Sequence, residues 1–337
     1  RGKRGEATVS YNGYYAVQEV YKTFDMMDLP AYARYNNEVA AEVAGINANP
    51  RFADPSILGP GTDWQEAIFQ LAPMQSHSIS ISGGTDATRY MVSGGYFEQE
   101  GIIIGSNFNR FNVRANIDTR ISKGIEIGGT IALSRKDETI TLQDGGDGVI
   151  SQAAQMPPHI PVRNFDGSFA GPDQQNASAQ IGSNPVALAL LRNNTVLDNR
   201  VMTTLYADIE LISALKFRSE IAVDYGNALI KAFQPSYEWG TIVNRTSQLG
   251  QSSNQNFFWV WRNYVTYNRS FNDHGLTAMV GYEAQKGQYD NFTAYKLGMP
   301  NDLPSMRQGD ISNIANTGVK GWNSLISSFA RAIYNYD

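Results

Sequence analysis

The stretch FNRFNVRANID, residues 108–118, decides the fold because polar and apolar residues alternate along it. From Phe111 onward the odd positions are apolar, whereas the even positions are Asn, Arg or Asp. Successive side chains of a β-strand point to opposite faces, so the pattern predicts a strand with one apolar and one charged face. Alternation alone leaves open whether the apolar face meets protein or lipid.

The same alternation recurs along the whole chain and predicts ten strands. They lie at residues 7–18, three between 76 and 118, and then near 125–134, 200–210, 216–225, 259–267, 276–282 and 330–336. Short links such as Gly-Gly-Thr-Asp at 83–86 suit tight hairpins. They alternate with long connections at about 19–75, 135–198, 226–254 and 286–323. In an antiparallel sheet, alternate links lie at opposite ends, so the long connections are expected at one end.

Two helices are expected inside the long connections. Asp28 followed by Leu-Pro-Ala predicts a helix that Asp28 caps and that runs to about Val43, and a second apolar helix is expected at 185–191.

Composition excludes several classes of protein. The chain has 337 residues, a formal net charge of −5 and no cysteine, so it has no basic patch for nucleic acid, no thiolate metal site and no disulfide scaffold. No apolar run approaches the ~20 residues that a spanning helix needs. A membrane β-barrel remains compatible, because its strands are only half apolar. Strand length and the unequal links predict an all-β, transmembrane antiparallel β-barrel with short periplasmic turns and long extracellular loops.

Many short motifs resemble one family of barrels. They are Asp63-Trp64, Ala72-Pro-Met-Gln-Ser-His77, Ser82-Gly-Gly-Thr85, Arg89-Tyr90, Ser93-Gly-Gly-Tyr96, Gln99-Glu-Gly101, Phe108-Asn-Arg110 and Asn112-Val-Arg-Ala-Asn116, with later matches at Pro157-Pro158, Asp166-Gly167, Asn184-Pro185, Leu215-Lys-Phe217, Asp224-Tyr225 and Phe329-Ala-Arg331. Together they resemble the start of the barrel in SusC/RagA-type TonB-dependent transporters. The resemblance covers essentially the whole chain.

The resemblance implies a multi-pass protein of the Gram-negative outer membrane that imports oligosaccharides or peptides. It implies a SusD-like surface lipoprotein as partner, TonB as energy source, a plug domain inside the barrel and lipid outside it. Residues 1–6 resemble the end of the plug. Residues 7–337 resemble about ten strands of a roughly 22-stranded barrel. The TonB box, the plug and half of the barrel are missing. We therefore expect a fragment of a longer polypeptide, because an open sheet exposes unpaired edges to lipid.

No catalytic pattern is visible, and no enzymatic activity is expected. The sequence contains no GxSxG, HExxH or Walker motif, and His77, His159 and His274 do not have metal-ligand spacing. No cofactor is expected. The acidic loop with Asp144 and Asp147 lacks the regular calcium-loop spacing, although Ca²⁺ in a long extracellular loop stays open.

Aromatic residues are the candidates for contacts with substrate and membrane. Flat rings stack on sugars, so the loop aromatics Trp64, Phe165, Tyr237, Trp239 and Trp322 are candidate substrate contacts, with packing inside the loops as the alternative. The apolar faces of the strands carry candidate membrane-interface anchors, because amphipathic rings favour the headgroup layer. They are Trp259, Trp261, Tyr267, Tyr334 and Tyr336.

Two other functions fit the pattern. A secreted carbohydrate-binding or adhesin module would bury the apolar faces between two sheets, and a passive porin would lack the plug. The importer interpretation fails if Phe111, Ile131, Ile221 and Val280 are packed in a protein interior beneath a second layer.

Overall fold

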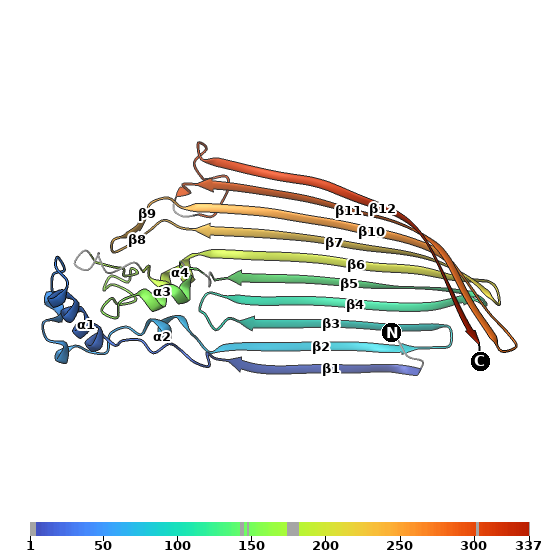
Figure 1. Cartoon of the computed structure of the whole chain (residues 1–337), viewed down its shortest axis with the longest axis horizontal. Coiled ribbons are helices and arrows are strands. Elements are labelled where there is room, and N and C mark those ends of the chain that lie inside the picture. The colour runs from blue at the N-terminus through green and yellow to red at the C-terminus, as the bar shows by residue number, and fades with distance from the viewer. Residues whose placement is uncertain (1–4, 142–144, 147, 174–181, 301–302, 337) are drawn as a thin grey trace.

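A computed structural model describes residues 5–141, 145–146, 148–173, 182–300 and 303–336. They form one curved antiparallel sheet of ten strands, each paired with its neighbours in chain order (Figure 1). The prediction of ten antiparallel strands is confirmed. No helix among these residues is long and apolar enough to cross a membrane.

The strands of the large sheet are β1 (Gly5–Gln18), β2 (Ala72–Gly84), β3 (Thr88–Glu100), β4 (Asn107–Ser122), β5 (Ile125–Ile140), β6 (Asn193–Ile212), β7 (Leu215–Gln234), β10 (Gln248–Phe271), β11 (His274–Leu297) and β12 (Ile314–Tyr336). A separate small hairpin joins β8 (Tyr237–Trp239) to β9 (Ile242–Asn244). The helices are α1 (Leu29–Glu42), α2 (Trp64–Ile68), α3 (Val149–Gln155) and α4 (Pro185–Leu191), with 3₁₀ turns η1 (Pro50–Phe52) and η2 (Pro55–Ile57).

The connections divide between the two ends of the sheet as expected. Tight turns join β2 to β3, β4 to β5, β6 to β7 and β10 to β11. Gly124 and Asn272 adopt positive φ angles of 86° and 51° in two of these turns, a conformation that glycine and asparagine tolerate best. All helices and the small hairpin gather at the opposite end, and we call these segments the loop cap (Figure 1).

The long connections are shorter than the sequence pattern indicated. They span 19–71, 141–192, 235–247 and 298–313, instead of 19–75, 135–198, 226–254 and 286–323. The expected bounds were wrong because strand pairing continues where alternation stops. Polar residues at 248–256, for example, still pair with both β7 and β11. Backbone hydrogen bonds need no apolar face, so a strand can project beyond the apolar band.

Both predicted helices are present. The Asp28 side chain accepts a hydrogen bond from the Ala31 amide at 2.8 Å, and Pro30 occupies the first turn of α1. The helix ends at Glu42, one residue before the predicted limit. Asn184 caps α4 in the same way through the Ala187 amide, because short polar side chains satisfy the free amides at a helix start.

The largest apolar core lies in the loop cap, and a smaller cluster of Phe233, Leu249 and Met299 lies at the ends of β7 and β10. The core in the loop cap unites α2, the link after β3, α3, α4 and the small hairpin. The buried members are Trp64, Ile68, Ile103, Val149, Ala153, Met156, Ile160, Ala170, Val186, Ala187, Leu188, Ala189 and Trp239. Segments from four connections therefore fold as one unit at this end of the sheet.

Candidate functional site

One face of the sheet is apolar and exposed. Phe111, Ile131, Ile221 and Val280 have exposed fractions of 58%, 41%, 43% and 61%. Directly paired residues point to the same face, and the strand register places these four on one side, which we call the outer face. No second layer of the described chain covers them. The burial that a sandwich module requires is therefore absent from this part of the chain.

The outer face is uncharged over a band of limited height. Arg269 on β10, which pairs with Leu276, is an outer charge at the short-turn end of the band. Beyond it, the first outer charges are Glu98 on β3, Arg135 on β5, Lys231 on β7, Lys286 on β11 and Lys320 on β12. From Leu276 to Lys286 is about ten residues, which at ~3.4 Å per residue and ~40° tilt makes an apolar band of roughly 26 Å. Outer-membrane barrels have an apolar band of about 25 Å.

The five predicted anchors lie at the two edges of this band. Trp259 pairs with Lys286, and Trp261 with the neighbouring outer position, so both indoles lie where outer charges begin. Tyr267, Tyr334 and Tyr336 lie beside the last short turn. Two rows of aromatic residues separated by an apolar band match the pattern of membrane-interface girdles. Their contact with lipid stays a prediction.

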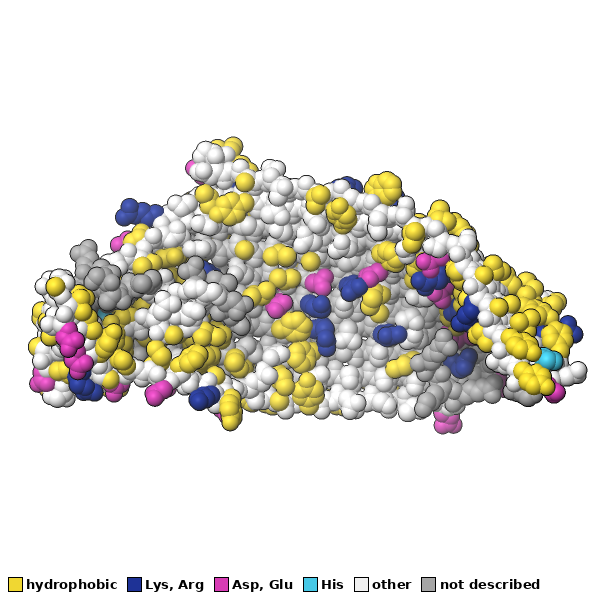
Figure 2. Space-filling model, in the orientation of Figure 1, with side chains coloured by type: hydrophobic (Ala, Val, Ile, Leu, Met, Phe, Trp, Pro, Cys, Tyr) yellow, Lys and Arg dark blue, Asp and Glu magenta, His cyan; other side chains and the backbone are white. Residues whose placement is uncertain are grey.

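The opposite face, which we call the inner face, carries paired charges. Figure 2 shows acidic and basic side chains gathered over the middle of the face turned to the viewer. Six ion pairs cross from strand to strand: Arg89–Glu126 at 3.7 Å, Lys136–Asp198 at 3.4 Å, Arg200–Asp224 at 2.5 Å, Arg218–Asp208 at 3.2 Å, Arg262–Glu220 at 3.3 Å and Arg262–Glu283 at 2.5 Å. Arg218 and Glu220 pair within β7 at 3.2 Å.

These pairs join into a belt near the short-turn end. Glu220 contacts both Arg218 and Arg262, and the Arg218 guanidinium lies 4.0 Å from the ring centroid of Tyr206. The Tyr206 hydroxyl donates a hydrogen bond to Asp118, 2.6 Å away. The belt runs from β4 to β11 when the Arg262–Glu283 pair is included. A half-exposed wall of alternating charges favours water, and its pairing lowers the net charge of this face.

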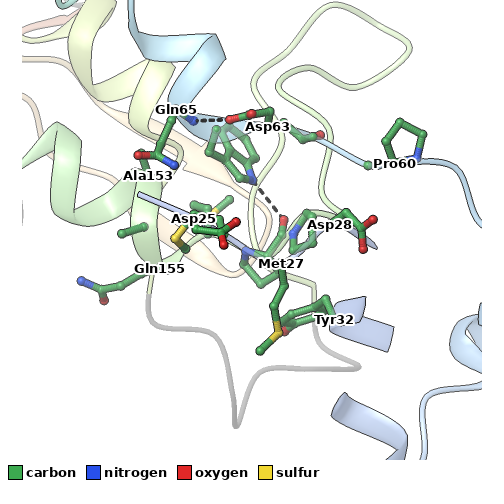
Figure 3. A pocket seen from close by; sticks show the side chains of 17 residues that line it. Asp25, Met27, Asp28, Tyr32, Pro60, Asp63, Gln65, Ala153 and Gln155 are labelled. Atoms are coloured by element: carbon green, nitrogen blue, oxygen red, sulfur yellow. Dashed lines mark hydrogen bonds between the residues drawn. The ribbon is translucent and has the colours of Figure 1, made fainter. Parts of the chain in front are cut away.

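A cleft of about 420 Å³ opens between two connections of the loop cap. Segments 25–28 and 60–65, before β2, form one side of it, and 153–158, after β5, forms the other. Figure 3 shows Asp25, Met27 and Gln155 around the cleft. Asp28 and Asp63 also border it, although each accepts hydrogen bonds from helix amides. The cleft therefore presents carboxylates and thioethers at the end of the sheet where the long connections meet.

A second contact holds the outer part of the first connection to the loop cap. The His159 ring stacks on Tyr32 and meets Phe52 edge-on, with centroids 5.9 and 5.3 Å apart. Arg51 forms an ion pair of 2.7 Å with Asp173 beside these rings. Burial lowers the pKa of His159 below its ordinary value, Asp173 opposes the shift, and Arg51 adds to it. The neutral imidazole is therefore the form that packs best here.

The predicted substrate-contact residues do not form one site. Trp64 and Trp239 are buried, with 3% and 4% exposure, so their ring faces cannot stack on a sugar. Trp64 borders the cleft and donates its indole N–H to the Pro157 carbonyl at 3.0 Å. Tyr237 stacks on Trp239 with centroids 3.8 Å apart, whereas Phe165 is fully exposed. The packing alternative holds for both tryptophans, because the loop cap needs large apolar side chains for its core.

Trp322 does not lie in a loop. It belongs to β12, where it pairs with Gln288 on the outer face, and the Lys286 ammonium lies 5.4 Å from its ring centroid. The expected loop position was wrong because β12 begins at Ile314. The ring is 67% exposed at the level where outer charges begin, a position that suits an interface residue.

The histidines bond to tyrosines or pack in the loop cap. His77 Nδ1 lies 2.7 Å from the Tyr11 hydroxyl, and His274 Nδ1 lies 2.6 Å from the Tyr334 hydroxyl. Among the described residues, no three of His, Asp and Glu come together in a way that could hold a metal ion. The calcium question concerns Asp144 and Asp147, which lie outside the described residues.

No sequence motif predicted the cleft. Its two sides are about 90 residues apart in the chain and have no shared motif. The helix-capping aspartates at 28 and 63 were the available signal, because they mark where each segment turns toward the loop cap.

Sequence comparison finds relatives along the whole length of the chain. The TonB-dependent receptor P3 of Formosa agariphila is 28% identical over 348 residues, covering 100% of this chain and 33% of the receptor. The TonB-dependent receptor SusC of Bacteroides thetaiotaomicron is 24% identical and covers 99% of this chain and 34% of the receptor. The chain thus spans about a third of the length of these curated relatives. No family model matches it.

Comparison with solved structures gives the same fold. A chain of the RagAB peptide importer in its closed-closed state superposes with a TM-score of 0.80 at 19% identity, covering 100% of this chain and 41% of that one. The open-open state superposes equally well, at 20% identity. These matches confirm the resemblance to SusC/RagA-type TonB-dependent receptors that the sequence motifs predicted.

Proposed function

We propose that this chain, a relative of SusC/RagA-type TonB-dependent receptors along its whole length, forms part of the wall and extracellular loop cap of an outer-membrane importer. Its cargo is a peptide or an oligosaccharide. The wall performs no chemistry on the cargo, and its relatives carry the names of receptors and not of enzymes.

One observation supports this function above the others. The sheet exposes a charge-free apolar band of roughly 26 Å on its outer face, while ion pairs line its inner face. Hydrocarbon on one side and water on the other is the arrangement that satisfies both faces, since each strand then places apolar and charged groups in the solvents that suit them.

The inner belt of ion pairs has two uses in such an importer. Its paired charges keep the inner face hydrated and produce no strong electrostatic field of one sign. Neutral glycans and zwitterionic peptides can therefore pass. The same groups offer hydrogen bonds to a plug domain inside the barrel. Arg262, which already contacts Glu220 and Glu283, has exposed donor capacity for such a contact.

The loop cap is the side on which cargo and a SusD-like lipoprotein arrive. Phe165 presents a fully exposed ring there, and the cleft beside Asp25 and Met27 is open to solvent. A flat ring packs on a sugar face or an apolar side chain, and acidic groups suit a peptide amine. TonB supplies energy through the plug, in keeping with the names of the relatives.

The function can be tested in cells that carry the full-length gene. We expect deletion of the gene to abolish uptake of a fluorescent oligopeptide pool or an oligosaccharide pool, and a protonophore to have the same effect. Replacing Phe165 by Ser should raise the half-saturating cargo concentration about twofold to tenfold, since a ring contact is worth ~0.5–1.5 kcal/mol. Tyr21→Ser is the matched control, because Tyr21 is another fully exposed loop aromatic outside the candidate set.

Three results would contradict this function. Uptake that survives a protonophore would favour a passive porin. Recovery of the native protein in aqueous extract without detergent would favour a secreted module. An affinity-tagged receptor that retains no surface lipoprotein after mild solubilisation would remove the proposed partner.

A further inference from the structure

The outer face is not uniformly flat, and two of its depressions follow β4, β5 and β6. Five rows of directly paired residues run up these three strands, from Thr119–Ile127–Ala207 near the short turns to Phe111–Arg135–Asn199 near the loop cap. Two depressions of about 500 and 280 Å³ follow one another along these rows, the first lined up to Ala115 and the second from Val113. We call them together the outer groove.

Small residues make the floor of the groove, and branched ones make its walls. Ala115, Gly129 and Thr203 occupy its middle, flanked by Ile117, Ile127, Ile131 and Leu205. A Cβ added to Gly129 would lie 2.6 Å from Leu205 Cδ2 and 2.7 Å from the Thr204 carbonyl oxygen. Glycine therefore permits Leu205 to lean over this strand and to border the groove.

The upper end of the groove carries a positive charge. Arg135 lines the second depression together with Phe111, Leu133 and Val201. It is exposed and forms no ion pair with any other described residue. Asp137 follows on the same face one row further from the apolar band. The groove thus runs from an apolar floor to a guanidinium at the edge of the band.

We infer that the outer groove binds a phosphorylated lipid of the outer leaflet, with acyl chains along Ala115, Gly129 and Thr203 and a phosphate at Arg135. This inference rests on the membrane orientation in the proposed function. The larger depression, of about 500 Å³, is within the ~300–1,000 Å³ typical of ligand pockets, and the lining is apolar below the arginine.

Charge position selects this occupant over a second copy of the chain. Arginine binds phosphate through paired N–H donors, and the headgroup layer is where a membrane lipid places its phosphate. A groove of this depth also leaves empty volume against a flat partner strand, whereas flexible acyl chains can fill it. A lipid satisfies both the apolar floor and the charged end.

The test uses the full-length receptor, delipidated in detergent, with native mass spectrometry as readout. The probes are bisphosphorylated lipid A, the same lipid without phosphates, and phosphatidylethanolamine. We expect a one-to-one adduct that is strongest with the bisphosphorylated lipid. Arg135→Gln should weaken it about fivefold, since a cation near a membrane surface contributes ~1 kcal/mol, and Asp137→Asn should strengthen it.

Groove-filling variants test the apolar part. Ala115→Leu and Thr203→Leu should each remove most of the adduct, because their side chains enter the floor. Ala278→Leu is the matched control on the outer face of β11, and Lys286→Gln is the control for Arg135, since Lys286 lies at a similar level on a distant strand. A heat-modifiability gel for each variant verifies that the barrel has folded.

Several outcomes would overturn the inference. Equal binding of the dephosphorylated lipid would remove the role of Arg135. Unchanged adducts in both folded groove-filling variants would remove the groove. A variant that alters the oligomeric state and leaves lipid binding intact would assign the surface to a second copy. These readouts need no cargo, so their failure is distinct from a failure of import.

Discussion

The indole nitrogen of Trp64 donates a hydrogen bond to the backbone carbonyl of Pro157, 3.0 Å away, although the two residues are 93 positions apart. Trp64 begins α2 in the first long connection, and Pro157 follows α3 in the second. A buried indole N–H needs an acceptor, and this contact provides it where the two connections border the cleft. The bond therefore makes the loop cap one folded unit.

Replacing Trp64 should loosen the cap without unfolding the sheet. Trp64→Phe removes the hydrogen bond and should raise amide exchange in 149–158 about fivefold, for a cost of ~1 kcal/mol. Trp64→Ala also leaves a cavity and should cost ~3–5 kcal/mol locally. Hydrogen exchange with mass spectrometry on the full-length receptor measures both, with strand peptides as the control. Equal exchange in wild type and Trp64→Ala would contradict the role assigned to this contact.

An added charge should destabilise the outer face of β6 more than its inner face. Leu205→Arg places a cation in the middle of the apolar band and should destabilise folding in vesicles by ~2–4 kcal/mol. Thr204→Arg points to the inner face, between Thr130 and Ala222, and should cost less than ~1 kcal/mol. Urea-dependent folding into lipid vesicles compares them. If Thr204→Arg proved the more damaging change, the assignment of inner and outer faces would be reversed.

The ion pair between Arg262 and Glu283 should contribute modestly and depend on salt. Arg262 is partly exposed, so we expect a coupling free energy of ~0.5–1 kcal/mol in a double-mutant cycle of Arg262→Gln and Glu283→Gln. The coupling should shrink in 1 M salt, where screening reaches ~3 Å. A coupling of zero at low salt would mean that these charges interact with water on the inner face but that their pairing does not stabilise the sheet.

Acidification should loosen the contact around His159. The pKa of His159 is lowered in the folded cap, chiefly by burial. Neutral His159 stabilises the cap above its unfolded pKa of about 6.5, and this stabilisation is lost as pH falls through the folded value. Amide exchange in 50–57, corrected for its intrinsic pH dependence, should therefore rise between pH 7.5 and pH 5. His159→Phe keeps the stacking on Tyr32 and should abolish the pH dependence; a persistent dependence would point to another group.

Most of the sheet could be predicted because its determinants are local. Alternation along 108–118 fixes which side chains share a face, and turn residues such as Gly124 fix where strands reverse. Strand ends could not be predicted from alternation. Residues 248–256 pair on both sides although they are mostly polar, because the neighbouring strands supply hydrogen-bond partners whatever the side chain.

The site residues were harder to predict than the strands. Sequence identified Trp64, Tyr237 and Trp239 as loop aromatics, but their burial depends on α3 and α4, which arrive from another connection. Trp322 was misplaced because the chain around it has no strong alternation until β12 is paired with β11. Of the five predicted substrate-contact residues, Phe165 is the one whose ring is fully exposed in a loop.

The sequence by itself determined an antiparallel sheet with one apolar and one charged face, since side-chain direction in a strand follows from covalent geometry. Only the tertiary structure decided that the apolar face stays uncovered, that Arg218 and Arg262 join neighbouring strands into a belt, and that distant connections enclose a cleft beside Trp64. The reason is that burial and pairing are properties of which segments meet, and those meetings are set by strand register and loop packing across more than ninety residues of chain.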